Sequence, residues 1–370
     1  MNAIESAEIL DPGLRVRFRD GREDVFPWLW LRDHCREPDS YDTRTAQREL
    51  WTANLPANVS ADSFDLSKDG TTLSVRWRDE DLTSRYDASF LAEFVLTPGQ
   101  HSSPRLYRKA ESWDTAKVQN SLAPVAYTDL ETSGVADMLD QIDRLGFALV
   151  QGCPQDPASV EQIARGVGYV RETIFGGIWS FESNDQMADT AYTPKALRPH
   201  TDSTYSHDAP GLQLLLCLAY DAEGGESLLV DGLRIAETLR ETHPGEFETL
   251  TRIPVPGQYL GDGAHLVAER PVIRMGSDGQ IEQISFNNYD RAPFRLPDAD
   301  MSDFYQAIRA FDLLANDPDM QWRKVLAPGE LIIFDNWRVL HGRSAFTGYR
   351  KMAGCYLNRE DFESALRVSQ

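Results

Sequence analysis

Short segments in which apolar and polar residues alternate, each bounded by a turn signal, constrain the fold of this chain more than any other feature. Alternation with a period of two is typical of strands that bury one face. In the first hundred residues, segments 14–18 and 73–77 show this alternation beside the turn pairs Asp20-Gly21 and Asp69-Gly70. We therefore predict a small β-rich domain over residues 1–100.

The rest of the chain predicts a second domain built mainly from strands. Residues 101–125 are polar and poorly periodic, which is typical of a linker. Beyond them, the patterns indicate helices at 135–145, 158–167 and 302–314, strands at 147–150, 211–220, 227–230, 331–334 and 352–357, and a turn at 221–225. Many strands with flanking helices predict a double-stranded β-helix, or jelly roll, over residues 126–370. No internal repeat is visible.

Composition argues against several classes of partner. The formal net charge is −21, so a nucleic acid or an anionic membrane would be repelled. No stretch approaches the roughly 20 apolar residues that cross a bilayer, and the acidic N-terminus lacks the basic and apolar parts of a signal peptide. The four cysteines are scattered without a CxxC pair, which indicates reduced thiols. We expect a cytoplasmic protein without nucleic-acid or membrane partners.

Two short motifs, HTD at 200–202 and HGR at 341–343, carry a candidate metal site. In an extended segment, residues i and i+2 point to the same face, so His200 and Asp202 can bind one ion together. His341 follows the apolar strand expected at 331–334, which can return a third ligand across the sheet. Two histidines and one carboxylate with open coordination positions are typical of non-haem iron oxygenases. An HxD pair also arises by chance at surfaces and helix N-caps, so it needs support from the wider sequence.

That wider sequence contains, in order, RETIFGGIWSFESNDQMADTAYTPKALRPHTDSTY, GLQLLLCLAYDAEGGESLLVDG, FNNYDRAPF and FDNWRVLHGRSAFTGYRKMAGCYLNRED. These segments resemble the trimethyllysine and γ-butyrobetaine dioxygenases of the TauD-like superfamily. The N-terminal WLRDHCREPDSYDTRTAQREL is similar to the small β-domain that precedes their catalytic domain. The resemblance covers nearly the whole chain. It implies a jelly-roll hydroxylase that uses Fe(II), 2-oxoglutarate and O2, and that forms a homodimer.

The resemblance also assigns the cofactor ligands. The iron triad matches His200, Asp202 and His341. Arg350 matches the arginine that binds the distal carboxylate of 2-oxoglutarate, a role suited to a bidentate guanidinium. Arg343 is the weaker candidate for that role. Ser227, within GGES, matches a hydroxyl position that assists binding of the cosubstrate.

A set of aromatic residues points to the substrate class. The cage that surrounds a trimethylammonium group in this family matches Phe175, Trp179, Tyr192 and Tyr356. A quaternary ammonium has no N–H, so aromatic π-faces hold it instead of hydrogen bonds. Each aromatic could instead be an ordinary core residue. Asp189 matches a position that meets an α-ammonium in trimethyllysine enzymes. Asn288 and Arg291 are expected at the anionic end of the substrate, with a surface salt bridge as the alternative for Arg291.

One feature of the relatives is missing. They often bind a structural zinc through three cysteines and a histidine, whereas this chain has only Cys35, with Glu37, Ser40 and Asp81 at the other positions. One thiolate with hard oxygen ligands makes a poor structural zinc site, so we expect no zinc. The remaining histidines show no ligand spacing and are expected to be structural or exposed: His34, His101, His207, His243 and His265.

We therefore predict an Fe(II)- and 2-oxoglutarate-dependent dioxygenase that hydroxylates a methylene C–H of a small trimethylammonium zwitterion. N6-trimethyllysine is the first choice of substrate. γ-Butyrobetaine and a 2-(trimethylammonio)ethylphosphonate-type compound remain open. A protein of another class, which binds quaternary amines without catalysis, also remains open, although the intact triad and Arg350 argue against it.

Overall fold

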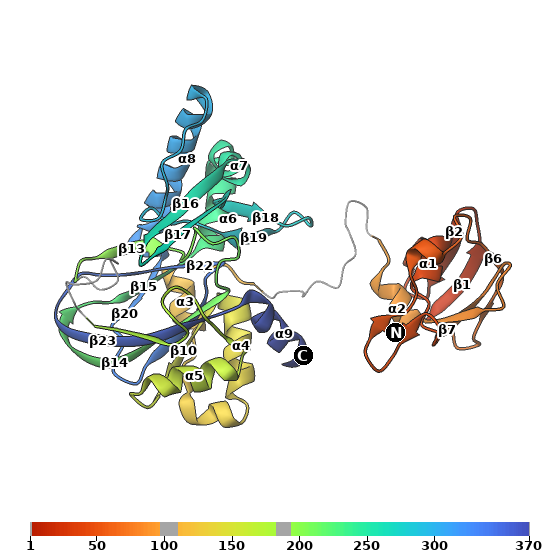
Figure 1. Cartoon of the computed structure of the whole chain (residues 1–370), viewed down its shortest axis with the longest axis horizontal. Helices are drawn as coiled ribbons and strands as arrows, with labels where there is room; N and C mark the ends of the chain where they lie inside the picture. Colours follow the sequence, from red (N-terminus) through yellow and green to blue (C-terminus); the bar gives the residue numbers. More distant parts are fainter. Residues whose placement is uncertain (1, 97–109, 183–193, 370) are drawn as a thin grey trace. The chain divides into compact units, whose positions relative to one another are not determined.

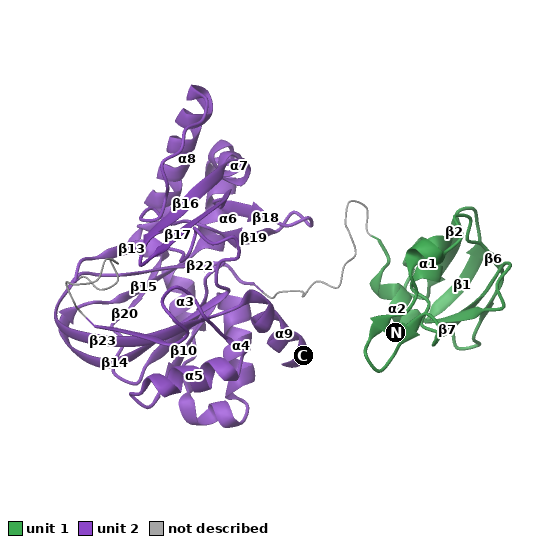
Figure 2. Cartoon of the chain, viewed as in Figure 1, with its two compact units in different colours: residues 1–105 green, residues 106–370 purple. Residues whose placement is uncertain are grey.

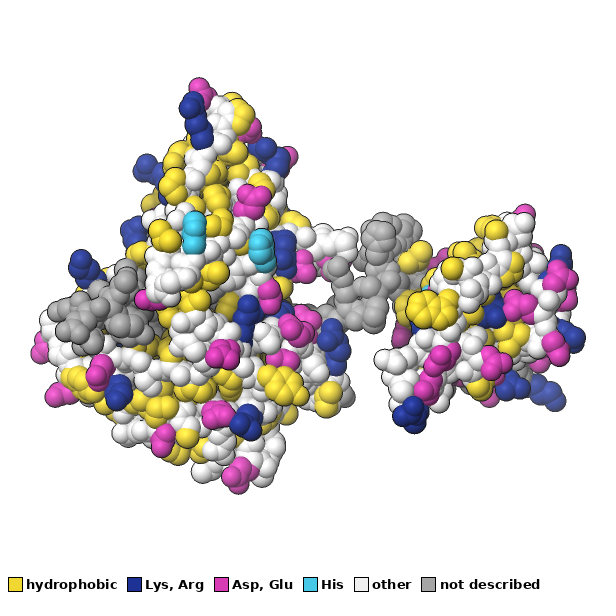
Figure 3. Space-filling view, viewed as in Figure 1, with side chains coloured by type: hydrophobic (Ala, Val, Ile, Leu, Met, Phe, Trp, Pro, Cys, Tyr) yellow, Lys and Arg dark blue, Asp and Glu magenta, His cyan; other side chains and the backbone are white. Residues whose placement is uncertain are grey.

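The computed structural model describes residues 2–96, 110–182 and 194–369. The chain forms two compact units, Met1–Arg105 and Leu106–Gln370 (Figure 2). Among the described residues, no helix combines the length and the apolar character that a membrane span requires. Acidic and basic side chains are interspersed over the visible face of each unit (Figure 3).

The first unit consists of two copies of one motif, three antiparallel strands followed by a short helix (Figure 1). The first copy is β1 (Ile4–Ile9), β2 (Gly13–Phe18), β3 (Glu23–Pro27) and α1 (Trp28–Asp33). The second is β6 (Ala61–Leu66), β7 (Thr72–Trp77), β8 (Thr83–Asp87) and α2 (Ala88–Glu93). Between them lie β4 (Tyr41–Asp42), β5 (Gln47–Arg48) and a 3-10 turn, η1 (Thr52–Asn54).

This internal repeat was not predicted, because its two copies share a pattern rather than a sequence. Both copies carry an irregularity at the same place, after Ile4 in β1 and after Ala61 in β6. The copies share one core, in which the rings of Trp28 and Trp77 meet edge to face at 6.3 Å. The Ile4 N–H also donates to the Gly70 carbonyl at 2.8 Å, which joins the first copy to the second.

The second unit is built around two facing sheets (Figure 1). The strands of the larger sheet lie in the order β11-β23-β14-β21-β10-β9, and β12 also pairs with β23. Their ranges are β9 (Val125–Ala126), β10 (Phe147–Gln151), β11 (Val170–Arg171), β12 (Trp179–Glu182), β14 (Leu212–Gly224), β21 (Leu331–Asp335) and β23 (Phe346–Leu357). The smaller has the order β13-β22-β15-β20: β13 (Leu197–His200), β15 (Ser227–Asp231), β20 (Gln321–Lys324) and β22 (Val339–Arg343). This arrangement confirms the predicted jelly roll.

Helices cover the outer face of each sheet (Figure 1). On the larger sheet lie α4 (Gly134–Leu145), α5 (Pro157–Arg165) and α9 (Arg359–Ser369). On the smaller sheet lie α6 (Gly232–Thr242), α7 (Pro244–Arg252) and α8 (Asp298–Ala315). A third cluster, which includes Phe334 of β21 and Leu229 of β15, fills part of the space between the sheets. The two sheets are therefore packed together by side chains from their inner faces.

Two hairpins between α7 and α8 were not predicted. They are β16 (Pro254–Gly261) with β17 (Ala264–Pro271), and β18 (Ile273–Met275) with β19 (Ile281–Ile284). The backbone of β16 lies directly on the segment after Asp202: a Cβ at Gly257 would come within 2.6 Å of the Thr204 backbone. This hairpin therefore forms one wall of the functional site described below.

The predicted linker at 101–125 differs from the structure in its second half. Trp113 is buried, and its indole N–H donates to the Leu145 carbonyl at 2.6 Å. Asp114 then caps α3 (Thr115–Ser121) by accepting a hydrogen bond from the Lys117 N–H. The sequence does not reveal this segment, because it contains few apolar residues and its contacts, such as buried Val118 and the hydrogen bond from the Trp113 N–H to Asp231, are made with distant parts of the chain. The short helices η2 (Tyr127–Glu131) and η4 (Pro318–Met320) complete the unit.

Candidate active site

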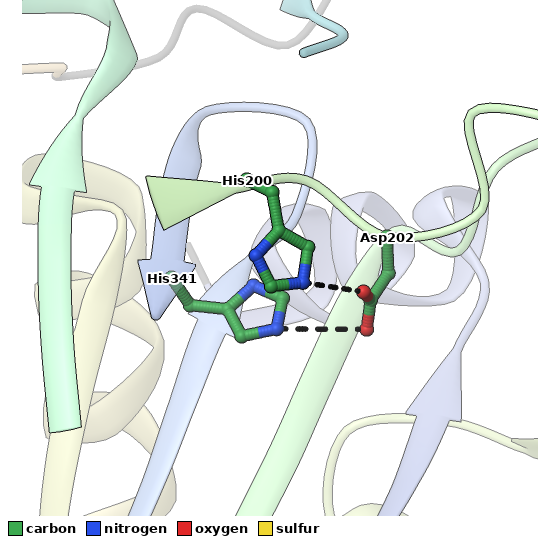
Figure 4. Close-up of side chains that lie close together, drawn as sticks. All are labelled: His200, Asp202 and His341. Atoms are coloured by element: carbon green, nitrogen blue, oxygen red, sulfur yellow. Dashed lines mark ion pairs between the residues drawn. The ribbon is translucent and has the colours of Figure 1, made fainter. Parts of the chain in front are cut away.

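The two histidines of the candidate metal site lie side by side on paired strands. His200 ends β13 and stands directly opposite His341 of β22, with ring centroids 4.4 Å apart. Asp202 follows His200 by two residues, so its carboxylate reaches both rings (Figure 4). Oδ1 lies 3.4 Å from His200 Nε2, and Oδ2 lies 3.7 Å from His341 Nε2. The ligand atoms of all three residues lie within 4.8 Å of one another.

Burial and charge leave the triad ready to bind a cation. Burial lowers the pKa of His341 to about 4, so its imidazole is neutral at neutral pH. Burial works against ionisation of Asp202, but His341 and His200 hold its pKa well below the usual value. For His200, burial is outweighed by the hydrogen bond and charge of Asp202, and the pKa is raised. Two imidazole nitrogens and one carboxylate are the donor set that suits Fe(II) in oxygenases, so the residues fit this metal.

Surrounding groups orient the ligands. His200 Nδ1 lies 2.8 Å from the Arg198 carbonyl, which directs Nε2 toward Asp202. Asn336 holds the main chain of Asp202 from both sides: its Oδ1 accepts the Asp202 N–H at 2.8 Å, and its Nδ2 donates to the Asp202 carbonyl at 3.2 Å. Tyr356 donates its hydroxyl to Asp202 Oδ2 at 2.8 Å. Asn336 was not predicted, because the FDN motif gives no sign of which partner it binds.

The triad faces a cavity of about 350 Å³ that is lined by both sheets and by the β16–β17 hairpin. This volume is within the range of roughly 300–1,000 Å³ that is usual for small-molecule sites. Arg343 of β22 and Arg350 of β23 both line it and are buried. Burial lowers the pKa of both guanidinium groups, that of Arg343 to about 10 with a contribution from the charge of Arg350. Ser227 stands opposite Arg343 in the smaller sheet and also lines the cavity.

The two arginines have different surroundings. Arg343 donates to the Lys195 carbonyl at 2.8 Å. Arg350 forms no ion pair with any Asp or Glu within the described ranges. A buried cation is costly unless an anion meets it. The cavity therefore provides a place for a carboxylate beside Arg350.

Three of the four predicted cage residues line the same cavity: Phe175, Trp179 and Tyr356. The rings of Trp179 and Tyr356 are 5.6 Å apart at 51°. Trp179 stands opposite Gly354 on β23, where a Cβ would come within 2.4 Å of the indole. The glycine thus lets the indole lie against the strand. Tyr192 and Asp189 lie outside the described residues.

The two residues predicted at the anionic end of the substrate do not line the cavity. Asn288 is exposed, whereas its neighbour Asn287 is part of the cavity wall. Arg291 points its guanidinium at the Phe304 ring, 5.9 Å from the centroid. The sequence motif FNNYDRA indicates that this segment lies at the site, but it does not show that Asn287, rather than Asn288, lines the cavity. Further cavity residues that were missed are Tyr205, Gln213, Gln258, Tyr259 and Asp290.

The residues that stand where relatives carry zinc ligands, Cys35, Glu37, Ser40 and Asp81, lie in the first unit. Buried Cys35 accepts a hydrogen bond from Ser84 at 2.9 Å, and Ser40 Oγ lies 3.3 Å from Arg32. Arg32 forms a forked ion pair with Glu80 at 2.8 and 3.0 Å. Glu37 is partly buried and Asp81 is exposed. Of the other histidines, His34 stacks on Trp30, and His101 lies outside the described residues. The remaining three are exposed: His207, His243 and His265.

Comparison with known proteins defines the class. Residues 114–356 match the family model "Taurine catabolism dioxygenase TauD, TfdA family". Residues 10–92 match the model "Gamma-butyrobetaine hydroxylase-like, N-terminal". The chain belongs to the TauD/TfdA family and is an Fe(II)- and 2-oxoglutarate-dependent dioxygenase. The resemblance, the fold, the reaction class and the cofactors that the sequence predicted are thereby confirmed.

Within this class, the chain is 36% identical to a mitochondrial trimethyllysine dioxygenase of Bos taurus, over 93% of this chain and 82% of that protein. It is 30% identical to a γ-butyrobetaine dioxygenase of Pseudomonas sp. (strain AK-1), over 100% of this chain and 97% of the relative. A structure of a taurine dioxygenase homologue from Burkholderia xenovorans, described as putative and α-ketoglutarate-dependent, matches with a TM-score of 0.51 at 14% identity. That match covers 69% of this chain and 93% of the other, and it supports the fold alone.

Proposed function

We propose that this dioxygenase hydroxylates a methylene C–H of a small trimethylammonium zwitterion, with N6-trimethyllysine as the first choice. The observation that carries the proposal is the aromatic wall of Phe175, Trp179 and Tyr356 beside the triad. Aromatic faces attract a quaternary ammonium, each contact contributing roughly 0.5–2 kcal/mol when water is excluded. The names of the mammalian and bacterial relatives support the same substrate class.

We assign separate residues of the cavity to the metal, to 2-oxoglutarate and to the substrate. His200, Asp202 and His341 would hold Fe(II), which would supply, together with O2, the oxidising power for C–H hydroxylation, with 2-oxoglutarate converted to succinate and CO2. Arg350 binds the distal carboxylate of 2-oxoglutarate as a bidentate donor, with Ser227 beside it. Arg343 adds positive charge to that side of the cavity. The aromatic wall fixes the substrate so that one methylene faces the metal.

The choice of trimethyllysine also rests on Asp189, for which we propose contact with the substrate α-ammonium, and on Tyr192 as the fourth cage residue. γ-Butyrobetaine has no α-ammonium, so an ionised Asp189 would favour trimethyllysine. The γ-butyrobetaine dioxygenase among the relatives keeps that substrate as the alternative. A trimethylammonium phosphonate is a further alternative, because the aromatic wall would hold its trimethylammonium group in the same way.

A binding protein without turnover is the alternative from another class. The complete triad and the buried Arg350 support catalysis instead, since binding a quaternary amine requires neither. Succinate formation from 2-oxoglutarate is the discriminating assay, run with and without Fe(II) on trimethyllysine, γ-butyrobetaine and the phosphonate. Fe(II)-dependent succinate formation above the substrate-free rate supports the enzyme. Tight binding of a betaine without succinate formation identifies a binding protein.

The oligomeric state, the cellular location and the kind of partner are also proposals. We infer a homodimer from the family resemblance, which light scattering of the purified chain tests. All four cysteines are buried and unpaired, and this supports a reducing compartment such as the cytoplasm. The net charge of −21 supports a small-molecule substrate rather than a nucleic acid or an anionic membrane. Fractionation of the source cells tests the location.

A further inference from the structure

Asp290 is a residue of the cavity wall to which the proposed function assigns no role. Asp290 lines the same cavity as the triad residues His200, Asp202 and His341. It stands in the segment between β19 and α8. The backbone carbonyl of Asp290 accepts a hydrogen bond from the Gln258 N–H of β16 at 2.8 Å. The carboxylate is therefore carried by the part of the site that the β16–β17 hairpin closes.

The side chain of Asp290 is fixed by its neighbour Asn287. Asn287 Nδ2 donates to Asp290 Oδ2 at 2.8 Å and to the Thr201 carbonyl at 3.3 Å. The Thr201 N–H donates to the Phe286 carbonyl at 2.7 Å, and the Phe286 N–H donates to the Thr201 hydroxyl at 2.9 Å. The segment that carries Asp290 is thus tied to the segment that carries the metal ligands. A group held by Asp290 would have a defined position relative to the metal.

The groups around Asp290 suit a primary ammonium rather than a quaternary one. A primary ammonium has three N–H donors and needs hydrogen-bond acceptors. Asp290, a carboxylate residue in the cavity wall, supplies such acceptors. Tyr205 and Tyr259, whose rings are 5.3 Å apart, add aromatic faces that attract any cation. The wall formed by Trp179 of β12 and Tyr356 of β23 comes from other elements and offers mainly rings.

We propose that Asp290, positioned by Asn287, binds the α-ammonium of the substrate. The substrate is then an amino acid that carries a trimethylammonium group, with its two cationic ends held by separate parts of the cavity. This inference rests on the proposed function and goes beyond it, because it assigns the α-ammonium a second carboxylate, Asp290, in addition to the proposed Asp189. A site built to hydrogen-bond a substrate N–H rejects an analogue that lacks it.

The test compares two compounds that differ only in the α-amino group: N6-trimethyllysine and 6-(trimethylammonio)hexanoate. Asp290→Asn removes the charge and keeps the size of the side chain. Asp298→Asn is the matched control, because its side chain is 97% exposed on α8. The dissociation constants of both compounds are measured by calorimetry without O2, and kcat/KM is measured for both in air. Melting temperatures of the variants report on folding.

We expect the native enzyme and Asp298→Asn to prefer trimethyllysine, and Asp290→Asn to reduce that preference roughly 10- to 100-fold in binding and in kcat/KM. Equal losses for both compounds, or an unchanged preference, would overturn the inference. So would a preference that disappears in Asp189→Asn but persists in Asp290→Asn. A native enzyme that hydroxylates both compounds equally well overturns the inference but leaves the proposed function intact. A native enzyme that binds and hydroxylates neither overturns the inference and the choice of trimethyllysine, and the proposed function falls as well if γ-butyrobetaine and the phosphonate are not hydroxylated.

Discussion

Tyr356→Phe separates two contacts that one side chain makes in the active site. The ring of Tyr356 lies 5.6 Å from that of Trp179 in the aromatic wall, and phenylalanine keeps this contact. The hydroxyl donates to Asp202 Oδ2 at 2.8 Å, and phenylalanine removes it. Since Asp202 is a proposed ligand of Fe(II), the substitution should weaken Fe(II) binding while the proposed substrate cage persists.

The size of the effect follows from the kind of bond that is lost. A hydrogen bond to a charged group contributes roughly 1.5–3 kcal/mol. Loss of a partner that orients a metal ligand typically costs roughly 10- to 100-fold in metal affinity. Asp202 keeps the contacts of its main chain with Asn336, so we expect the lower part of this range, about tenfold.

Calorimetric titration with Fe(II) in the absence of O2 measures this loss directly. Tyr349→Phe is the control, because Tyr349 lies on the same strand and also donates to a carboxylate, Glu182, at 2.9 Å, but it is 45% exposed. We expect weaker Fe(II) binding in Tyr356→Phe alone, with the KM for the trimethylammonium substrate changed less than threefold at saturating Fe(II). Unchanged Fe(II) affinity in Tyr356→Phe would refute the positioning role of the hydroxyl.

Three other substitutions test separate parts of the account. Arg350→Lys should raise the KM for 2-oxoglutarate more than tenfold and that for the prime substrate far less, because lysine loses the bidentate contact; steady-state titration of both checks this, and an unchanged KM for 2-oxoglutarate would point to Arg343. Trp179→Ala should weaken binding of the trimethylammonium substrate by roughly 1–2 kcal/mol and leave 2-oxoglutarate unaffected, as measured by calorimetry; equal losses would indicate a general packing role. Glu80→Gln should destabilise the first unit by about 1–3 kcal/mol in urea denaturation, because it breaks the partly buried ion pair with Arg32. A chelator should not change the stability of this unit, and metal analysis should find no stoichiometric zinc. One zinc per chain would contradict this description of the unit.

Sequence could predict the features that depend on local pattern. The i, i+2 spacing of an extended segment predicted that Asp202 and His200 share a face. The strands that carry His200 and His341, β13 and β22, were not predicted, because neither LRPH nor VLHGR alternates strictly between buried and exposed residues. The family resemblance placed Arg350 and three cage residues in one cavity. The strands expected at 331–334 and 352–357 are confirmed, because apolar runs of that length are typical of buried strands. The roles of Arg350 and of the cage residues remain predictions.

Features that depend on long-range packing could not be predicted. Asn287 and Asn288 are chemically identical, and only the hydrogen bonds of Asn287 to Thr201 and Asp290 decide which one points inward. The region 110–125 is polar overall, yet the buried side chains of Trp113 and Val118 anchor it in the second unit, and the Trp113 N–H donates to Asp231 at 3.0 Å. The β16–β17 hairpin contains glycine and proline and shows no strict alternation, so its position over the cavity is visible only in the structure.

The central claim is that this chain couples oxidation of 2-oxoglutarate to hydroxylation of a trimethylammonium compound. The most direct measurement is mass spectrometry of N6-trimethyllysine after incubation with the enzyme, Fe(II), 2-oxoglutarate and O2, with succinate quantified in the same samples. The account predicts a product heavier by one oxygen atom, formed in equal amount to succinate, and none with Asp202→Ala that is still folded. Succinate without a hydroxylated product from trimethyllysine, γ-butyrobetaine or the phosphonate would contradict it.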